Sequence, residues 1–179
     1  MKKGIKILIV LIIVALIVLV FFIKKETTSS SLESESTPTE LSSEEMIPME
    51  YTAFSMEEFL APALPLMIDM GSASCGPCLQ MKPDLEEFYL ESYGKVSVRY
   101  ADIWEDPALS GGFPAMAVPV QYFFYADGTP YEPSEEILAQ IGFSLYSLRQ
   151  TGEHILTGHY GMLSKEQMYM IFRDMGVDL

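Results

Sequence analysis

The pattern of apolar and polar positions divides the chain into three regions. Residues 7–23, "ILIVLIIVALIVLVFFI", form an uninterrupted apolar run with lysines on both sides. Residues 26–45 are dominated by Ser, Thr and Glu, and residues 46–179 mix apolar and polar positions as a globular domain does. We therefore predict a membrane anchor, a linker and one domain of ordinary size.

The apolar run is interpreted as a retained transmembrane helix. As a helix it would span about 25 Å, close to a bilayer core of about 30 Å. It exceeds the usual signal-peptide core of about 7–15 residues, and the following "KKETTSS" offers no small-x-small cleavage site. Lysines before the run outnumber those after it, which favours a cytoplasmic tip within residues 1–25. The expected location is the cell membrane, single-pass, with the C-terminal domain extracytoplasmic.

The linker and the charge of the body limit the possible partners. Residues 26–45 contain seven Ser, four Thr and six Glu, and such a segment cannot bury enough surface to offset its ordering entropy. We predict a disordered Ser/Thr/Glu linker there. Beyond residue 25 the chain has six Lys and Arg against 25 Asp and Glu. Because this acidic body repels phosphate backbones, no nucleic-acid partner is expected.

Within residues 46–179 the periodicity predicts alternating strands and helices. Helices are expected at 55–61, 75–91 and 164–176, and strands at 64–71, 95–103, 121–131 and 153–161. Ser55 and Ser164 stand at helix-capping positions, and Pro83 should kink the second helix. The alternation of strands and helices predicts the α/β class.

The only two cysteines, Cys75 and Cys78, stand in "CGPC" at the start of a predicted helix. Unpaired N–H groups and the helix dipole favour thiolate at the first sulfur, and the second lies close enough to resolve a mixed disulfide. Gly76 and Pro77 permit and stiffen the turn between them. A redox pair is the preferred interpretation.

Two other interpretations of the pair remain open. His154 and His159 would complete a set of two Cys and two His for zinc, but they lie in a predicted strand, where positions five apart face opposite sides. A permanently oxidised structural disulfide would close so short a loop that it restricts the unfolded chain little. We therefore expect no metal and no cofactor beyond a redox-active Cys75–Cys78 disulfide.

Residues 50–179 resemble the thioredoxin family. "CGPC" is identical to the motif of that family, and Pro83 stands at its helix-kinking proline. The segments "RYADI", "AVPVQYFFYADGT" and "GHYGMLSKEQMYMIF" match further landmarks in order. The resemblance implies a thioredoxin-like fold, with a central mixed sheet flanked by helices and an insertion at about 130–152 before the last strand. Residues 134–149 could form one helix, broken near Gly142.

The resemblance also implies roles for individual residues. Cys75 would be the exposed nucleophile and Cys78 the buried resolving thiol. Asp69 would take and return the proton of Cys78, because a desolvated carboxyl has a raised pKa suited to that transfer. Val118 would pair with an extended substrate strand, and Pro119 would be a cis-proline facing the disulfide.

Two positions depart from the family pattern. Ser74 replaces a tryptophan before the first cysteine, which removes an aromatic group from the docking surface. Val98 replaces a buried lysine, which removes a cation that influences Asp69.

The activity implied by the resemblance is that of a monomeric, extracytoplasmic thiol-disulfide oxidoreductase. It would reduce disulfides of secreted or membrane-associated proteins, such as apocytochrome c. The chain has no second cysteine pair, so a separate membrane thiol electron donor would be required. Two alternatives remain: an oxidant that forms disulfides in secreted proteins, and a redox-inactive binding module with the same fold.

Overall fold

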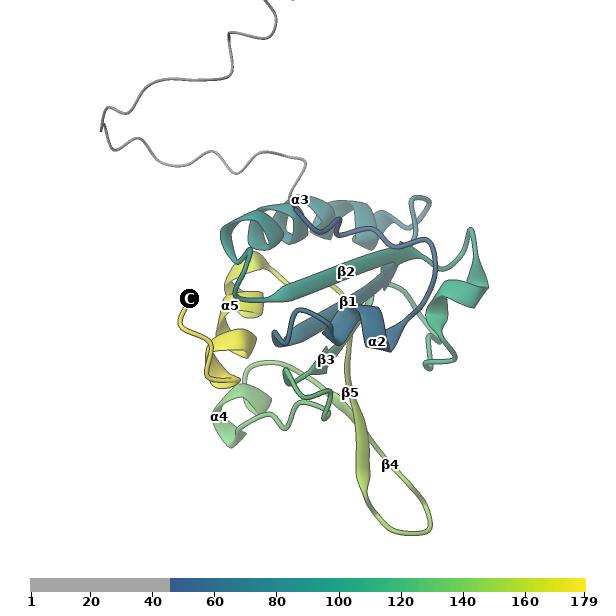
Figure 1. Ribbon diagram of the computed structural model, residues 1–179. Coiled ribbons are helices and arrows are strands. Elements are labelled where there is room, and N and C mark those ends of the chain that lie inside the picture. Colours follow the sequence, from purple (N-terminus) through teal and green to yellow (C-terminus); the bar gives the residue numbers. More distant parts are fainter. Residues whose placement is uncertain (1–45) are drawn as a thin grey trace, which may run out of the picture. The chain divides into compact units, whose positions relative to one another are not determined.

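A mixed five-stranded sheet forms the centre of residues 46–179, the part of the chain that the computed structural model describes (Figure 1). The strand order is β2 (Ser97–Asp102), β1 (Leu66–Gly71), β3 (Val120–Phe124), β5 (His154–Tyr160) and β4 (Ser144–Ser147). β1 is parallel to β2, and the other neighbouring pairs are antiparallel. The predicted α/β class and central mixed sheet are confirmed.

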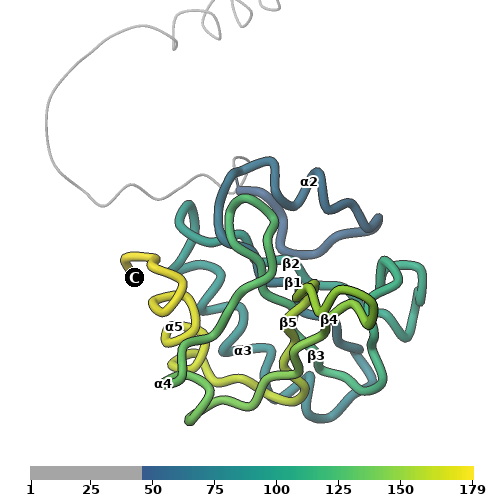
Figure 2. Tube along the Cα trace, turned by 90° about the horizontal axis from the view of Figure 1, so that it is seen from below, coloured from purple at the N-terminus to yellow at the C-terminus, as the bar shows by residue number. Residues whose placement is uncertain are grey.

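Helices cover both faces of the sheet. One face packs against α3 (Gly76–Glu91), α4 (Glu135–Leu138) and α5 (Lys165–Asp174). The other face packs against α2 (Met56–Leu60) and the 3-10 helix η1 (Pro107–Ser110). Figure 2 shows the strands β1 and β2 between α2 and α3. Because side chains alternate along a strand, β1, β2 and β3 each supply residues to the apolar cores on both faces, whereas the apolar residues of β4 and β5 pack on the α2 face.

The local signals that start the helices operate as predicted. Ser164 and Gln167 form a reciprocal capping box at α5, whose Met168, Ile171 and Phe172 are buried. Ser55 caps α2 by accepting the N–H of Glu58.

The predicted helix over residues 134–149 is wrong beyond its first turn. α4 ends at Leu138, and residues 144–147 form β4, which pairs with β5. Pairing with β4 satisfies backbone groups of β5 that a helix would have left at an open sheet edge. The predicted strand over 121–131 is likewise shorter, because the chain leaves the sheet after Phe124.

Among residues 46–179, every helix is too short or too polar to cross a bilayer. On this finding the predicted location, a single-pass membrane protein with an extracytoplasmic domain, is corrected. The predicted anchor at 7–23 and the predicted linker at 26–45 lie outside the described residues.

Candidate active site

The two cysteines are joined in a disulfide at the N-terminus of α3. Cys75 is the N-cap, Cys78 lies in the first turn, and their Cα atoms are 5.2 Å apart. The N–H of Cys78 donates to Cys75 Sγ at 3.2 Å. Pro77 fits the first turn because an N–H there would have no intrahelical acceptor. After reduction, the same N–H groups and the helix dipole stabilise a thiolate on Cys75.

Both cysteines are buried, with exposed fractions of 5% for Cys75 and 8% for Cys78. The prediction of an exposed Cys75 is therefore wrong for this oxidised form. Cys75 Sγ lies 3.6 Å from the carbonyl oxygen of Val118, so the loop before β3 packs directly on the disulfide. The Val118–Pro119 peptide bond is cis, as the resemblance implies.

The carbonyl of Pro114 ties that loop to the sheet. It accepts hydrogen bonds from the hydroxyls of Tyr122 on β3 and Tyr160 on β5, the latter at 2.7 Å. The hydroxyl of Tyr146 on β4 lies 3.0 Å from that of Tyr160, and it is the donor because Tyr160 already donates to Pro114. The insertion strand is thus connected to the loop that carries Val118.

Asp69 lies on β1, beneath the disulfide, with an exposed fraction of 2%. Burial raises the pKa of its carboxyl to about 7, although a hydrogen bond from the Gln121 amide opposes the rise. Gln121 Nε2 donates to Asp69 Oδ1 at 2.7 Å. A carboxyl with a pKa near 7 can accept and release protons at neutral pH, as a general acid–base must.

A cavity of about 50 Å³ connects this carboxyl with the resolving cysteine. Asp69 and Cys78 both line it, together with Lys82 of α3 and Tyr100 of β2. The volume can hold a water molecule, and the polar lining offers it partners. Asp69 and Cys78 therefore share one water-sized space.

Asp102, at the end of β2, organises the turn that leads to Cys75. Its carboxylate accepts the N–H groups of Ala73 at 2.7 Å and of Trp104 and Glu105 at 3.0 Å. Burial raises the pKa of this carboxyl, but the hydrogen bonds outweigh it and the pKa is lowered. Asp102 therefore stays ionised at neutral pH.

The two departures from the family pattern each have a local consequence. Ser74 forms a hydroxyl–hydroxyl hydrogen bond with Ser72 at 3.0 Å, and so keeps a small polar surface beside the disulfide. Val98 is part of the apolar core beneath α3.

Tyr100 packs closely on Gly71 at the end of β1. A Cβ added at position 71 would lie only 2.9 Å from the tyrosine ring, so the contact requires glycine there.

Sequence reasoning missed Gln121, Tyr100 and Lys82. A signal existed for Gln121, since it is the one amide in the otherwise apolar strand "VQYFF". Tyr100 and Lys82 carry no comparable signal, because only the pairing of β1 with β2 and the packing of α3 bring them to Asp69.

The zinc alternative has no geometric support. Both cysteines are in the disulfide, and among residues 46–179 no cluster of three His, Cys, Asp or Glu could hold a metal. His154 Nε2 lies 2.8 Å from Thr157 Oγ1, whereas His159 Nδ1 lies 2.7 Å from the carbonyl of Gly142.

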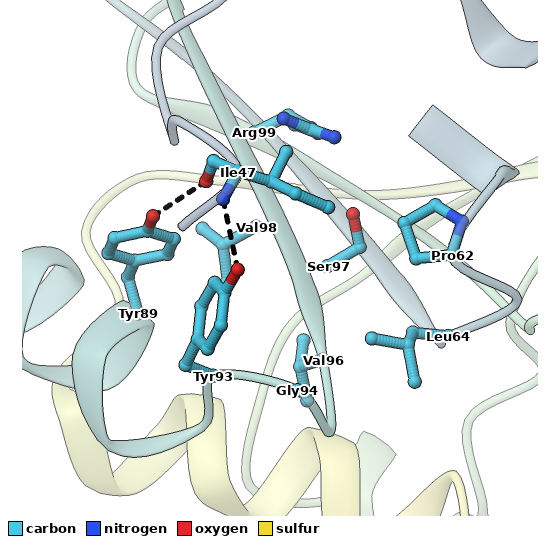
Figure 3. A pocket seen from close by; sticks show the side chains of 10 residues that line it. All are labelled: Ile47, Pro62, Leu64, Tyr89, Tyr93, Gly94, Val96, Ser97, Val98 and Arg99. Carbon is cyan, nitrogen blue, oxygen red and sulfur yellow. Dashed lines mark hydrogen bonds between the residues drawn. The ribbon is translucent and has the colours of Figure 1, made fainter. Parts of the chain in front are cut away.

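A larger cavity of about 210 Å³ lies at the other end of β2 (Figure 3). It is mainly apolar, and the backbone of Ile47 is held at its rim by hydrogen bonds with Tyr89 and Tyr93. Its ten lining residues include no cysteine and no carboxylate. We therefore place the chemistry at the smaller cavity beside the disulfide.

The fold and the cysteine pair define a thiol-disulfide oxidoreductase, and similar proteins identify its family. A thioredoxin of Alicyclobacillus acidocaldarius subsp. acidocaldarius is 31% identical over 99 residues, covering 52% of this chain and 93% of that protein. A thioredoxin of Staphylococcus aureus is 29% identical over 77 residues, covering 40% of this chain and 73% of that protein. The chain therefore belongs to the thioredoxin family.

Two further comparisons add little. The crystal structure of chloroplastic thioredoxin z aligns with a TM-score of 0.46 and 19% identity, covering 73% of this chain and 98% of that one. No protein-family model matches the chain.

Proposed function

We propose that this oxidoreductase reduces disulfide bonds in protein substrates by cycling Cys75 and Cys78 between dithiol and disulfide. The observation that carries the proposal is the placement of a buried acid, Asp69, on the same cavity as Cys78. A purely structural disulfide has no use for a proton acceptor at its second sulfur.

The first step is attack on the substrate. The Cys75 thiolate forms a bond to one sulfur of a substrate disulfide, the substrate S–S bond breaks, and the released thiolate takes a proton from solvent. The Val118 carbonyl, which precedes the cis bond to Pro119, lies against Cys75. An extended substrate strand can therefore pair with the Val118 backbone while its sulfur reaches the nucleophile.

The second step releases the product. Cys78 gives its proton through water to the Asp69 carboxylate, and the Cys78 thiolate attacks Cys75 Sγ. The Cys75–Cys78 bond forms, the bond from Cys75 to the substrate breaks, and the second substrate sulfur leaves as a thiolate that is then protonated. The substrate has gained two electrons and two protons, and the enzyme is oxidised as in this structure.

Another cycle requires two electrons from outside the chain. Cys75 and Cys78 are the only cysteines, so no internal pair can reduce them. The donor is therefore a separate dithiol, which regenerates the enzyme by the same exchange in reverse.

The test is reduction of insulin disulfides by the full-length protein with dithiothreitol as electron source. Catalysis above the dithiothreitol background, lost in Cys75→Ser, is expected. A Cys78→Ala variant should accumulate mixed disulfides between Cys75 and substrate, resolved on a non-reducing gel. A wild-type protein that gives only the background rate, and a Cys78→Ala variant that traps nothing, would contradict the proposal.

A further inference from the structure

A row of polar residues crosses four strands on the sheet face beneath α3. Strand register places Asp69 of β1 opposite Tyr100 of β2 on one side and opposite Gln121 of β3 on the other. Gln121 is in turn opposite His159 of β5. The neighbours along these strands on the same face, such as Met67 and Phe123, belong to the apolar core. The row is therefore a single polar line through that core.

The contacts of Gln121 fix the orientation of its amide. Its exposed fraction is 0%, and its Nε2 donates to Asp69 Oδ1. An ionised carboxylate only accepts hydrogen bonds, so toward the ionised form of Asp69 the amide turns its nitrogen and not its oxygen. The remaining atom, Gln121 Oε1, is buried with no partner among residues 46–179.

The opposite residue, His159, also has a buried atom that is unpartnered among residues 46–179, and that atom, like Gln121 Oε1, is an acceptor. Its Nδ1 contacts the carbonyl of Gly142, which can only accept, so Nδ1 carries a hydrogen. His159 Nε2 is buried and, like Gln121 Oε1, has no partner within the described part of the chain. The two unpartnered atoms belong to residues paired across β3 and β5.

Burying an amide costs free energy unless both of its polar atoms are hydrogen-bonded. Gln121 lies against apolar side chains, among them Met81 of α3, whose Sδ is 3.6 Å from Nε2. A leucine would bury a similar volume without desolvating two polar atoms, one of which remains unpartnered. The one strong hydrogen bond that the amide makes goes to the carboxyl that shares a cavity with Cys78.

We propose that Gln121 is a positioning residue for Asp69: its amide holds the carboxylate at the Cys78 cavity and stabilises the form that accepts the Cys78 proton. This inference rests on the proposed function. Loss of the amide N–H should leave the cysteines in place and change only the pKa of Asp69. The hydrogen bond to Gln121 lowers the pKa of Asp69 against the effect of burial, so its removal raises that pKa further.

Other charged or titratable groups also face Asp69 or the row. They are Lys82 on α3, Tyr100 on β2, His159 on β5 and, once reduced, Cys78 on α3. Tyr51 packs on the opposite face of the sheet, but its pKa is also raised by the charge of Asp69. The test must therefore change Gln121 alone and follow Asp69 directly.

The experiment compares wild type with Gln121→Leu by carbon NMR titration of the Asp69 carboxyl in the oxidised full-length protein, with Asp69→Asn assigning the signal. The midpoint should rise by about one pH unit, the size expected for a lost hydrogen bond to a charged group. The pH profile of insulin reduction should shift to higher pH by a similar amount. Phe123→Leu, two residues along on the same face of β3, is the packing control and should leave the midpoint unchanged.

The outcomes separate the two proposals. A folded Gln121→Leu protein with the wild-type midpoint overturns the role of Gln121, whatever the activity. Should Gln121→Leu fail to fold, Gln121→Met makes the same test with an unbranched side chain. A wild-type protein that does not reduce insulin contradicts the proposed function, while the NMR titration still decides whether Gln121 stabilises the Asp69 carboxylate.

Discussion

The two faces of the sheet serve the disulfide in different ways, although they are built from the same strands. Beneath α3 and α5, the apolar core is crossed by polar residues that include Asp69 and Gln121. On the face toward α2, the hydroxyls of Tyr122 and Tyr160 hold the Pro114 carbonyl. In the mechanism that we propose, the first face handles the proton of Cys78, and the second supports the loop that carries Val118. We therefore expect the reactivity of the cysteine pair to depend on residues outside the CGPC motif.

The largest effect on insulin reduction should follow from replacing either cysteine of the pair. Cys75→Ser removes the nucleophile, so insulin reduction should fall to the dithiothreitol background. Cys78→Ser should also abolish turnover but retain the first step. Mass spectrometry of the trapped species would then find substrate on Cys75; substrate bound nowhere would argue against the assigned order of attack.

Burial of Asp69 on the α3 face should make the stability of the protein depend on pH. The folded pKa of Asp69, about 7, lies above its ordinary value of 3.8, so folding favours the protonated carboxyl. Its stabilising effect is complete below about pH 4 and is lost as the pH rises to about 7, a change on the order of 4 kcal/mol. Asp69→Asn should therefore increase the free energy of unfolding of the oxidised protein more at pH 8 than at pH 4.

Urea unfolding of wild type and Asp69→Asn at both pH values measures this difference. An equal effect of the substitution at pH 4 and pH 8 would show that the carboxyl titrates normally in the folded protein.

The same substitution should slow catalysis. Without a carboxylate to accept the Cys78 proton, the rate of resolution near pH 7 should fall by about 10²-fold, the lower end of what general base catalysis contributes. Stopped-flow measurement of mixed-disulfide decay isolates this step. Raising the pH should restore much of the lost rate, because hydroxide can then deprotonate Cys78; a deficit that is constant with pH would indicate a structural effect instead.

The smallest effect on catalysis is expected from changes on the α2 face, where Tyr160 supports the loop that carries Val118. Tyr160→Phe removes one donor to Pro114 and the acceptor of Tyr146, which loosens the loop that carries Val118. We expect KM for insulin to rise a few-fold, as for the loss of one neutral hydrogen bond of about 1 kcal/mol. The reduction potential should stay unchanged.

Tyr146→Phe is the matched control for this prediction, since it removes only the outer hydroxyl and should raise KM less. A larger effect on kcat than on KM would place Tyr160 in the chemistry rather than in docking.

The parts of the site that depend on local sequence could be predicted, and those that depend on strand register could not. The helix start at Cys75 and the cap at Ser164 are set by neighbouring residues. The contact of Asp69 with Gln121, 52 positions apart, exists only because β1 and β3 pair in one register. Burial of Cys75 likewise depends on the distant Val118 loop.

The insertion shows the same limit. "SLYS" is too short for its own pattern to decide between helix and strand, and pairing with β5 settles it as β4. Tertiary context thus overrode local propensity.

The proposed reduction of protein disulfides is tested by the reduction potential of the Cys75–Cys78 pair. It is measured in the full-length protein, equilibrated against dithiothreitol and glutathione mixtures. A value near or below about −250 mV, in the range of thioredoxin at about −270 mV, is predicted for a reductase of protein disulfides. A value near about −120 mV would contradict it, because a pair of that potential gives up its disulfide to its substrates and acts as an oxidant.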